Sequence, residues 1–258
     1  MTVLSRALAA TGEHRGRCGL FFDFDGTLAP IQEDPAAVRP TPGVVELLDG
    51  LSARVRRVGI VSARPVRFLH EQFDGLTRVV LYGVYGMERW SPDPPHVVTD
   101  PAAARWEPVF GGLAARARAE LPGVLVEDKR LAVALHYRGA PMLAGEVNAW
   151  AAGRAAEHGV RVRVGRMVAE LTPPALPGKE AVLRAELAGL ACAWYFGDDL
   201  SDLPAFAALD AVSCAVRVAV GNPETGSEVV RAADLVLAGP ADVPALLRRI
   251  MAAVATPG

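Results

Sequence analysis

Two aspartates stand two positions apart near the start of the chain, directly after an apolar run, in the segment Asp23-Phe-Asp-Gly-Thr27. An aspartate carboxylate is a competent nucleophile toward phosphorus, and water can then cleave the acyl phosphate that it forms. A second carboxylate nearby can protonate the leaving alkoxide and later deprotonate the water. We therefore interpret Asp23 as a candidate nucleophile and Asp25 as a candidate general acid and base. Taken alone, either one also fits a strand-end aspartate that caps a turn.

Two further segments suit an anionic group. Val61-Ser-Ala-Arg64 stands between a predicted strand and a predicted helix, where the Ser62 hydroxyl and nearby N–H groups can hold a phosphate oxygen. We expect Arg64 beside it to contact the substrate. Lys179 begins another predicted helix, where the helix dipole disfavours a cation, and a bound anion would remove that conflict. The simpler alternatives are a helix N-cap for Ser62 and an exposed surface position for Lys179.

A fourth segment, Gly197-Asp-Asp-Leu-Ser-Asp202, gathers acidic residues at the end of a predicted buried strand. Carboxylates crowded in this way repel one another. A bound Mg²⁺ relieves the repulsion, because it takes a few carboxylate oxygens together with phosphate oxygen and water. The segment therefore predicts metal ligands, with Asp198 and Asp202 as the candidates. An aspartate-rich turn is the alternative.

The elements that carry these segments alternate between strand and helix patterns. Apolar runs typical of buried parallel strands alternate with stretches whose apolar residues recur at helical spacing. This order predicts a parallel, doubly wound sheet. The predicted strands span 18–24, 57–62, 77–82, 193–197, 211–220 and 234–237, and the helices 43–51, 65–73, 179–190, 202–209 and 243–254.

The middle of the chain has a different pattern. Half-exposed strands are predicted over 124–129, 131–137 and 161–165, with helices over 101–121 and 142–158 and turn signals at Pro122-Gly123 and Gly139. Strands that meet across short turns indicate an antiparallel α+β insertion. We predict a discontinuous core domain, 1–102 and 175–258, with an inserted cap or lid domain over 103–174. The proline-rich segment Ser91–Pro95 is interpreted as a surface loop.

The four chemical segments should converge, because the carboxyl ends of parallel strands in an open sheet share one crevice. A nucleophile, an acid and base, a metal and a cationic group would then lie together. Phosphoryl transfer needs these parts, because its transition state spreads negative charge over the equatorial oxygens.

Composition narrows the classes of protein that fit. The chain has 258 residues, 51% of them hydrophobic, which allows a sizeable core. A net charge of -2 without a basic stripe argues against a nucleic-acid partner, and the apolar runs are too short for a membrane span. The three cysteines form no CxxC pair, so that we expect buried apolar filler and no disulfide framework or zinc site. We expect a cytoplasmic monomer.

The segments resemble the four motifs of the haloacid dehalogenase superfamily, in the same order and spacing. Within it, the chain resembles the trehalose-6-phosphate phosphatase family. The matching segments include Ser62-Ala-Arg-Pro65, Glu127-Asp-Lys129, His136-Tyr-Arg138 and Glu170-Leu-Thr-Pro173.

The resemblance implies an α/β fold with a Rossmann-like parallel-sheet core and an inserted α+β cap. It implies that Glu127, Lys129 and Glu170 bind sugar hydroxyls, and that Asp23, the Asp25 carbonyl and Asp198 bind Mg²⁺. For His136, which neighbours this motif, strand packing is an equal alternative.

The resemblance further implies hydrolysis of trehalose 6-phosphate through a phospho-aspartate, with a small-molecule sugar phosphate as the partner. Three alternatives stay open: a phosphatase for a related sugar phosphate such as sucrose phosphate or a pseudo-disaccharide phosphate, a phosphomutase, and a catalytically silent sugar-phosphate sensor. The complete set of Asp23, Asp25, Lys179 and Asp198 argues against the sensor, since a sensor needs no nucleophile. Asp25 also disfavours a dehalogenase.

Overall fold

The computed structural model describes residues 2–165 and 167–255, and the chain divides into two compact units. The first unit comprises Met1–Val97 and Pro177–Gly258, and the second comprises Val98–Leu176. The sequence pattern had placed the boundaries at 102/103 and 174/175, and the division falls at 97/98 and 176/177.

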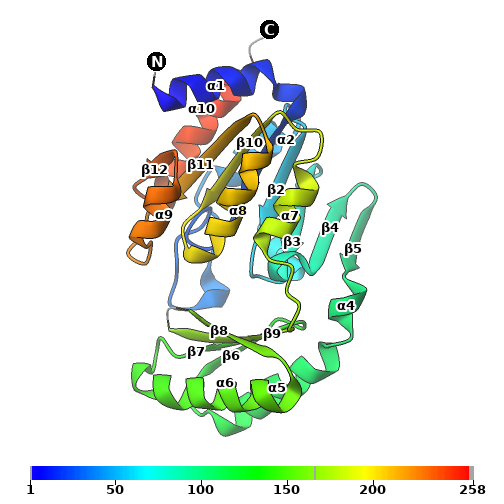
Figure 1. Ribbon diagram of the computed structural model, residues 1–258, viewed down its shortest axis with the longest axis vertical. Helices are drawn as coiled ribbons and strands as arrows, with labels where there is room; N and C mark the ends of the chain where they lie inside the picture. Colours follow the sequence, from blue (N-terminus) through cyan, green and yellow to red (C-terminus); the bar gives the residue numbers. More distant parts are fainter. Residues whose placement is uncertain (1, 166, 256–258) are drawn as a thin grey trace. The chain divides into compact units, whose positions relative to one another are not determined.

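An eight-stranded sheet forms the centre of the first unit, in the order β12-β11-β10-β1-β2-β3-β4-β5 (Figure 1). The six strands from β12 to β3 pair in parallel, as the alternation of strand and helix patterns predicts, and β4 pairs antiparallel to β3. The strands are β1 (Cys18–Phe22), β2 (Arg57–Val61), β3 (Val79–Gly83), β4 (Glu88–Pro92), β5 (Pro95–Thr99), β10 (Cys192–Gly197), β11 (Cys214–Val220) and β12 (Leu235–Leu237).

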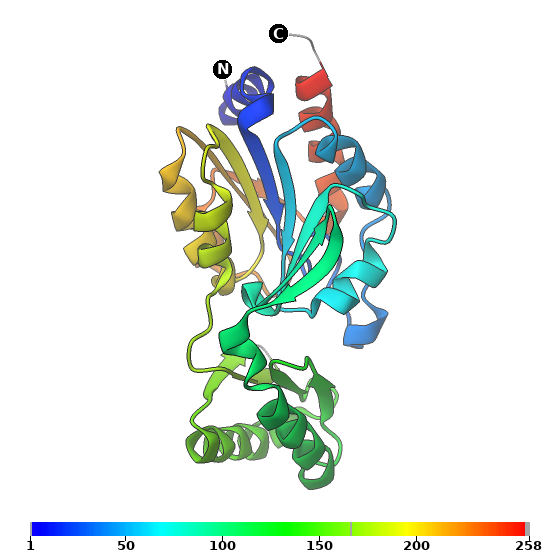
Figure 2. The same cartoon turned by 90° about the vertical axis from the view of Figure 1, so that its right-hand side faces the viewer.

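Helices cover both faces of this sheet. Side chains of α1, α2, α3 and α10 contribute to one buried cluster, and those of α7, α8 and α9 to another. Figure 2 shows the yellow and orange helices on one side of the sheet and the blue, cyan and red ones on the other. The helices are α1 (Val3–Glu13), α2 (Val44–Ser52), α3 (Val66–Gln72), α7 (Lys179–Glu186), α8 (Leu203–Ala208), α9 (Ser227–Ala232) and α10 (Val243–Ala255).

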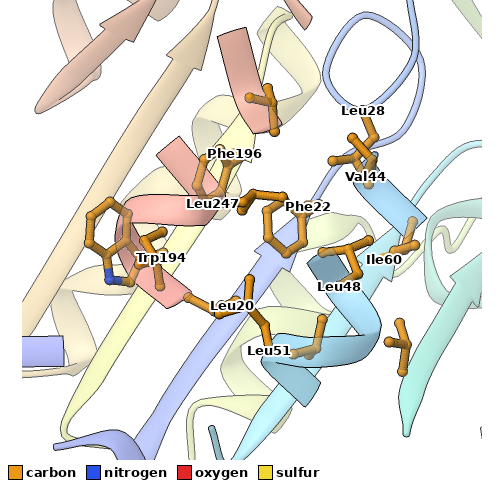
Figure 3. Close-up of a cluster of buried hydrophobic side chains, with 14 of the residues drawn as sticks. Leu20, Phe22, Leu28, Val44, Leu48, Leu51, Ile60, Trp194, Phe196 and Leu247 are labelled. Atoms are coloured by element: carbon orange, nitrogen blue, oxygen red, sulfur yellow. The ribbon is translucent and has the colours of Figure 1, made fainter. Parts of the chain in front are cut away.

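The central strands are buried on both faces, which is why they are apolar without interruption. Leu20 and Phe22 of β1 belong to the cluster on the α2 and α10 side, whereas Phe21 between them belongs to the opposite cluster. Figure 3 shows the first of these clusters. In it Phe22 stacks on Phe196 of the neighbouring strand β10, with 4.6 Å between ring centroids. The strand ends of β1 and β10, which carry the candidate catalytic residues, are therefore firmly anchored.

One segment differs from the prediction. The sequence pattern assigns Ser91–Pro95 to a surface loop, but only the turn between β4 and β5 lies there, and Ser91, Pro92 and Pro95 belong to the strands. Proline has no N–H to donate to a neighbouring strand, and the pattern was therefore interpreted as a loop. Pro92 and Pro95 are the last residue of β4 and the first of β5, and strand ends tolerate proline.

The second unit is a four-stranded antiparallel sheet, ordered β6-β7-β9-β8, with helices on one face. The buried cluster of this unit joins α5 and α6 to the alternate strand residues Val126, Leu135, Ala169 and Leu171. The predicted helix over 101–121 is divided into α4 and α5 at Arg105-Trp106. The elements are α4 (Pro101–Ala104), α5 (Glu107–Glu120), β6 (Leu125–Asp128), β7 (Val133–His136), α6 (Ala144–His158), β8 (Arg161–Gly165) and β9 (Val168–Thr172).

Short 3₁₀ turns connect many of these elements. They are η1 (Arg15–Arg17), η2 (Pro35–Ala37), η3 (Val84–Gly86), η4 (Pro141–Leu143), η5 (Leu200–Asp202), η6 (Leu209–Ala211) and η7 (Pro240–Asp242). Among the helices that the structure describes, none is both long enough and apolar enough to cross a membrane.

Candidate active site

The first predicted site residue, Asp23, follows the last residue of β1 and is 6% exposed. Its backbone N–H donates to the carbonyl of Phe196 on β10, at 2.9 Å, so that strand pairing continues to the site itself. The chain then turns through Gly26, whose φ is +82°. A Cβ atom at Gly26 would overlap the carboxylate of Asp198, and the turn therefore needs glycine for both its backbone angle and its lack of a side chain.

Lys179 joins two of the buried carboxylates. It is the first residue of α7 and is 3% exposed, and its Nζ lies 2.8 Å from Asp23 Oδ1 and 2.7 Å from Asp202 Oδ1. The surface-lysine alternative is therefore wrong for this position. The conflict with the helix dipole is resolved by these two anionic neighbours.

Asp202 is fully buried and accepts hydrogen bonds at both of its oxygens. Oδ1 accepts from Lys179 Nζ and from the Tyr195 hydroxyl, each at 2.7 Å. Oδ2 accepts from the backbone N–H groups of Asp198 and Asp199, at 2.9 and 3.2 Å. Four donors thus surround this carboxylate, which fixes both Lys179 and the loop after β10.

Asp198 is held by two neutral donors. The Thr27 hydroxyl donates to Oδ1 at 3.1 Å, and the Asn222 side chain donates to Oδ2 at 2.7 Å. Asn222 comes two residues after β11, so that a third strand end contributes to the site. The sequence analysis missed Tyr195 and Asn222 as site residues. The position of Asn222 after a predicted strand was a usable signal, but Tyr195 lies within the apolar run of β10 and reads as core.

Ser62 and Arg64 follow β2 at the same edge of the sheet. The Ser62 hydroxyl is buried and accepts from the Arg64 N–H at 3.1 Å. The Arg64 guanidinium donates to both oxygens of Asp25, from Nε at 2.8 Å and from Nη2 at 2.7 Å. It also lies over the Phe68 ring, 4.6 Å from the centroid. Arg64 is buried and the Asp25 side chain is 33% exposed, so this charge-assisted two-bond contact is partly shielded from solvent.

Burial and charge crowding dominate the electrostatics of the site. The pKa of Asp23 is raised to about 8, because burial and then the neighbouring charge of Asp202 outweigh the lowering effect of Lys179. Burial, with Asp23 as the next cause, also raises the pKa of Asp198 well above its ordinary value. For Lys179, burial alone would lower the pKa, but Asp202 and Asp23 raise it well above its usual range and keep the ammonium charged.

These carboxylates form a group suited to a cation. Asp23, Asp198 and Asp202 each offer an oxygen, and the three oxygens lie within 4.8 Å of one another. With all three ionised, the single ammonium of Lys179 leaves excess negative charge in a buried space. Carboxylate oxygens are the ligands that Mg²⁺ prefers, and the donor set therefore fits a hard divalent cation.

The remaining predicted site residues belong to the second unit. Glu127 of β6 and Glu170 of β9 are in register across Ala134 of β7, on the sheet face opposite the buried cluster. Lys129 Nζ donates to Glu170 Oε1 at 2.7 Å, and both residues are 6% exposed. His136 Nε2 lies 2.8 Å from Glu127 Oε2, so that His136 has a polar partner on this face besides its packing in the strand.

Two groups of predicted residues are thus brought together, each within one unit. The first unit gathers Asp23, Lys179, Asp198 and Asp202 in one hydrogen-bonded network, with the pair of Asp25 and Arg64 following β1 and β2. The second unit gathers Glu127, Lys129 and Glu170 on one face of its sheet. The structure leaves the roles of these residues in binding and catalysis as predictions.

The fold is of the type found in haloacid dehalogenase-like hydrolases. A haloacid dehalogenase-like hydrolase from Bacteroides thetaiotaomicron superposes with a TM-score of 0.61 at 15% identity, covering 90% of this chain and 98% of that one. Residues 21–234 match the family model described as trehalose-phosphatase. The chain belongs to the trehalose-phosphatase family and is a phosphatase, a phosphoric monoester hydrolase.

Individual relatives agree with this assignment. The chain is 36% identical over 274 residues to a trehalose-phosphate phosphatase of Mycobacterium marinum, covering all of this chain and 68% of the relative. It is 38% identical over 221 residues to that of Mycobacterium tuberculosis strain H37Rv, covering 80% of this chain and 56% of the relative. The crystal structure of a trehalose-6-phosphate phosphatase related protein superposes with a TM-score of 0.75 at 26% identity, covering 91% of this chain and 97% of that one.

Proposed function

We propose that this phosphatase hydrolyses trehalose 6-phosphate to trehalose and phosphate, through a phospho-aspartate at Asp23 and with Mg²⁺ as its cofactor. The observation that carries the chemistry is the buried network in which Lys179 lies 2.8 Å from Asp23 and 2.7 Å from Asp202. The trehalose-phosphatase family assignment supports the substrate.

In this proposal Asp23 Oδ attacks the phosphorus, and the bond from phosphorus to the sugar oxygen breaks. Lys179, together with the Ser62 hydroxyl, stabilises the negative charge on the phosphoryl oxygens. Asp25 protonates the leaving sugar oxygen and then takes a proton from the water that cleaves the acyl phosphate. Arg64, which we expected to contact substrate, is better placed to hold the Asp25 carboxylate, because it donates to both of its oxygens.

Asp23 and Asp198, with the backbone carbonyl of Asp25, would hold the Mg²⁺. When bound, the ion would neutralise the excess charge of the carboxylates and of the phosphate. Asp202 was predicted as a further ligand, but its oxygens already accept four hydrogen bonds. We propose instead that Asp202 positions Lys179 and the loop after β10.

We propose that the second unit acts as a cap that selects the sugar. Phosphate and metal are common to all phosphate esters, so discrimination needs other residues. Glu127, Lys129 and Glu170 offer charged acceptors and donors on one sheet face, which suits sugar hydroxyls. Closure of such a cap would exclude water before the acyl phosphate forms. Small-angle scattering with and without Mg²⁺ and a phosphate analogue tests this, since closure predicts a smaller radius of gyration.

The test of the proposed function is phosphate release from a panel of esters with purified protein and Mg²⁺. The panel contains trehalose 6-phosphate, sucrose 6-phosphate, glucose 6-phosphate and p-nitrophenyl phosphate. The proposal expects the highest kcat/KM with trehalose 6-phosphate. A higher kcat/KM with another sugar phosphate would identify that ester as the substrate in place of trehalose 6-phosphate. Movement of phosphate within one sugar would indicate a mutase, and the absence of turnover on every ester would support the sensor.

A further inference from the structure

All three cysteines of the chain lie in one row across neighbouring strands. Cys18 of β1 is in register with Cys192 of β10, and Cys192 is in register with Cys214 of β11. They begin these three strands, at the end of the sheet opposite the candidate active site. From the sequence they are expected to be apolar filler, because they are odd in number and form no CxxC pair.

The pair on β10 and β11 lies within reach of a disulfide bond. The Sγ atoms of Cys192 and Cys214 lie 3.0 Å apart, and both residues occur as free thiols. Neighbouring strands are about 4.7–4.9 Å apart, which falls within the Cα separation of about 4.4–6.8 Å found in disulfides. Closing the bond therefore needs adjustment of side-chain torsions and little movement of the backbone.

Accessibility distinguishes this pair from the other possible one. Cys18 and Cys192 are both 0% exposed, whereas Cys214 is partly exposed. A small oxidant in solution therefore reaches Cys214 first, and the cysteine in register with Cys214 is Cys192. A disulfide between Cys18 and Cys192 would need the oxidant to enter the packed core.

We propose that Cys192 and Cys214 form a reversible oxidation site, which closes to a disulfide bond when a peroxide reaches Cys214. The sulfur of Cys214 attacks one peroxide oxygen, the O–O bond breaks, and a sulfenic acid and one water result. The sulfur of Cys192 then displaces the hydroxyl group of the sulfenic acid, forming the S–S bond and, with the thiol proton, a second water. The two thiols lose two protons and two electrons, and hydrogen peroxide takes them up to become two waters.

The environment of the thiols makes this reaction slow. The neighbouring Cys18 thiol and burial raise the pKa of Cys192 to about 12. The contact with Cys192, followed by burial, raises the pKa of Cys214 well above its ordinary value. Since the thiolate is the reactive form, the bond should form under sustained exposure to oxidant and not within a brief pulse.

The bond should leave the phosphatase chemistry intact. Cys192 is six residues before Asp198, which corresponds to about 20 Å along an extended strand. Phosphate release should therefore change by less than about twofold on oxidation, and an effect on activity is not the readout.

The experiment is disulfide mapping of the folded full-length protein. Wild type is exposed to hydrogen peroxide, its remaining thiols are alkylated, and peptides are mapped by mass spectrometry without reduction. The expected result is a linked pair of peptides containing Cys192 and Cys214, a fall from three free thiols to one, and reversal by dithiothreitol. Cys18→Ala should still form the link, and Cys214→Ala should not.

Several outcomes would overturn the proposal. They are a link between Cys18 and Cys192, a link between two molecules through Cys214, over-oxidation of Cys214 alone, or three thiols that persist through prolonged exposure. The mapping of wild type is decisive even if a cysteine variant fails to fold.

Discussion

The two units hold their charged residues in different ways. In the first unit, Lys179 and Asp202 are 3% and 0% exposed, and each has several charged or polar partners. In the second unit, Lys129 and Glu170 also form a buried pair, each 6% exposed, but the side chains of Glu127 and His136 form a pair and are 21% and 23% exposed. A buried network keeps its atoms fixed, whereas a partly exposed pair can exchange its partner for a hydroxyl group. We therefore expect fixed charge at the site of bond cleavage, and Glu127 to be the recognition residue that exchanges its partner most readily.

Removing the nucleophile should have the largest effect. In Asp23→Asn the side chain keeps its shape but cannot attack phosphorus, and we expect a loss on the order of 10⁴-fold in kcat on every phosphate ester. The measurement is phosphate release from trehalose 6-phosphate and p-nitrophenyl phosphate. Asp74→Asn, in an exposed loop of the same unit, is the matched control and should retain full activity. Near-normal turnover in Asp23→Asn would remove Asp23 from the mechanism.

Substitutions on the second unit should separate the substrates. A hydrogen bond to a charged group contributes about 1.5–3 kcal/mol, so that Glu127→Ala or Glu170→Ala should lower kcat/KM for trehalose 6-phosphate roughly 10- to 200-fold. The value for p-nitrophenyl phosphate should barely change, since it lacks sugar hydroxyls. Glu157→Ala, on the exposed surface of α6, is the control. Equal losses on both substrates would mean that Glu127 and Glu170 support folding or bond cleavage. The assignment of recognition to the second unit would then be wrong.

Substitution of Arg64 tests whether this residue acts on the reaction indirectly, by positioning Asp25. Arg64→Ala should lower kcat about 10- to 100-fold with little change in KM, because Asp25 loses its anchor while the phosphate contacts remain. Arg64→Lys should restore part of the rate. Arg67→Ala, exposed on α3, which begins two residues after Arg64, should behave as wild type. A rise in KM alone would return Arg64 to the substrate-binding role predicted from the sequence.

The smallest effect concerns the metal. Magnesium at about 100 times its dissociation constant stabilises a folded site by about 2.7 kcal/mol, which corresponds to a rise of roughly 5–10 °C in Tm. Thermal unfolding with and without MgCl₂ measures this. Asp198→Asn should lose most of the rise, because it removes one of the two proposed carboxylate ligands. An undiminished rise in Asp198→Asn would place the cation elsewhere.

The sequence allowed the parallel core and most of the site to be predicted, because Asp23, Ser62 and Asp198 each follow an apolar run that can only be a buried strand. The carboxyl ends of strands in a parallel sheet lie at one edge, so that the topology alone predicts that these residues lie close together. The inserted antiparallel sheet was predicted from the half-exposed strands that correspond to β6, β7 and β8, but β9 was not predicted. The monomeric state and cytoplasmic location stay predictions.

The partners of these residues were harder to predict. Whether Arg64 contacts a phosphate or the Asp25 carboxylate depends on how two loops approach each other, and spacing carries no such information. Tyr195 was not predicted as a site residue because it lies within the apolar run that identifies β10, where a tyrosine is expected to pack in the core. The strands β4 and β5 were missed because their terminal prolines are equally typical of a loop.

The close approach of Gly26 to Asp198 has a consequence for engineering. Substitutions of Gly26 should be as poorly tolerated as substitutions of Asp23, although glycine contributes no functional group. The reason is that any side chain at position 26 would overlap the Asp198 carboxylate. A library built to broaden the range of accepted sugars should therefore leave Gly26 invariant. Its diversity is better placed around Glu127, whose side chain is partly exposed, than at the buried Glu170.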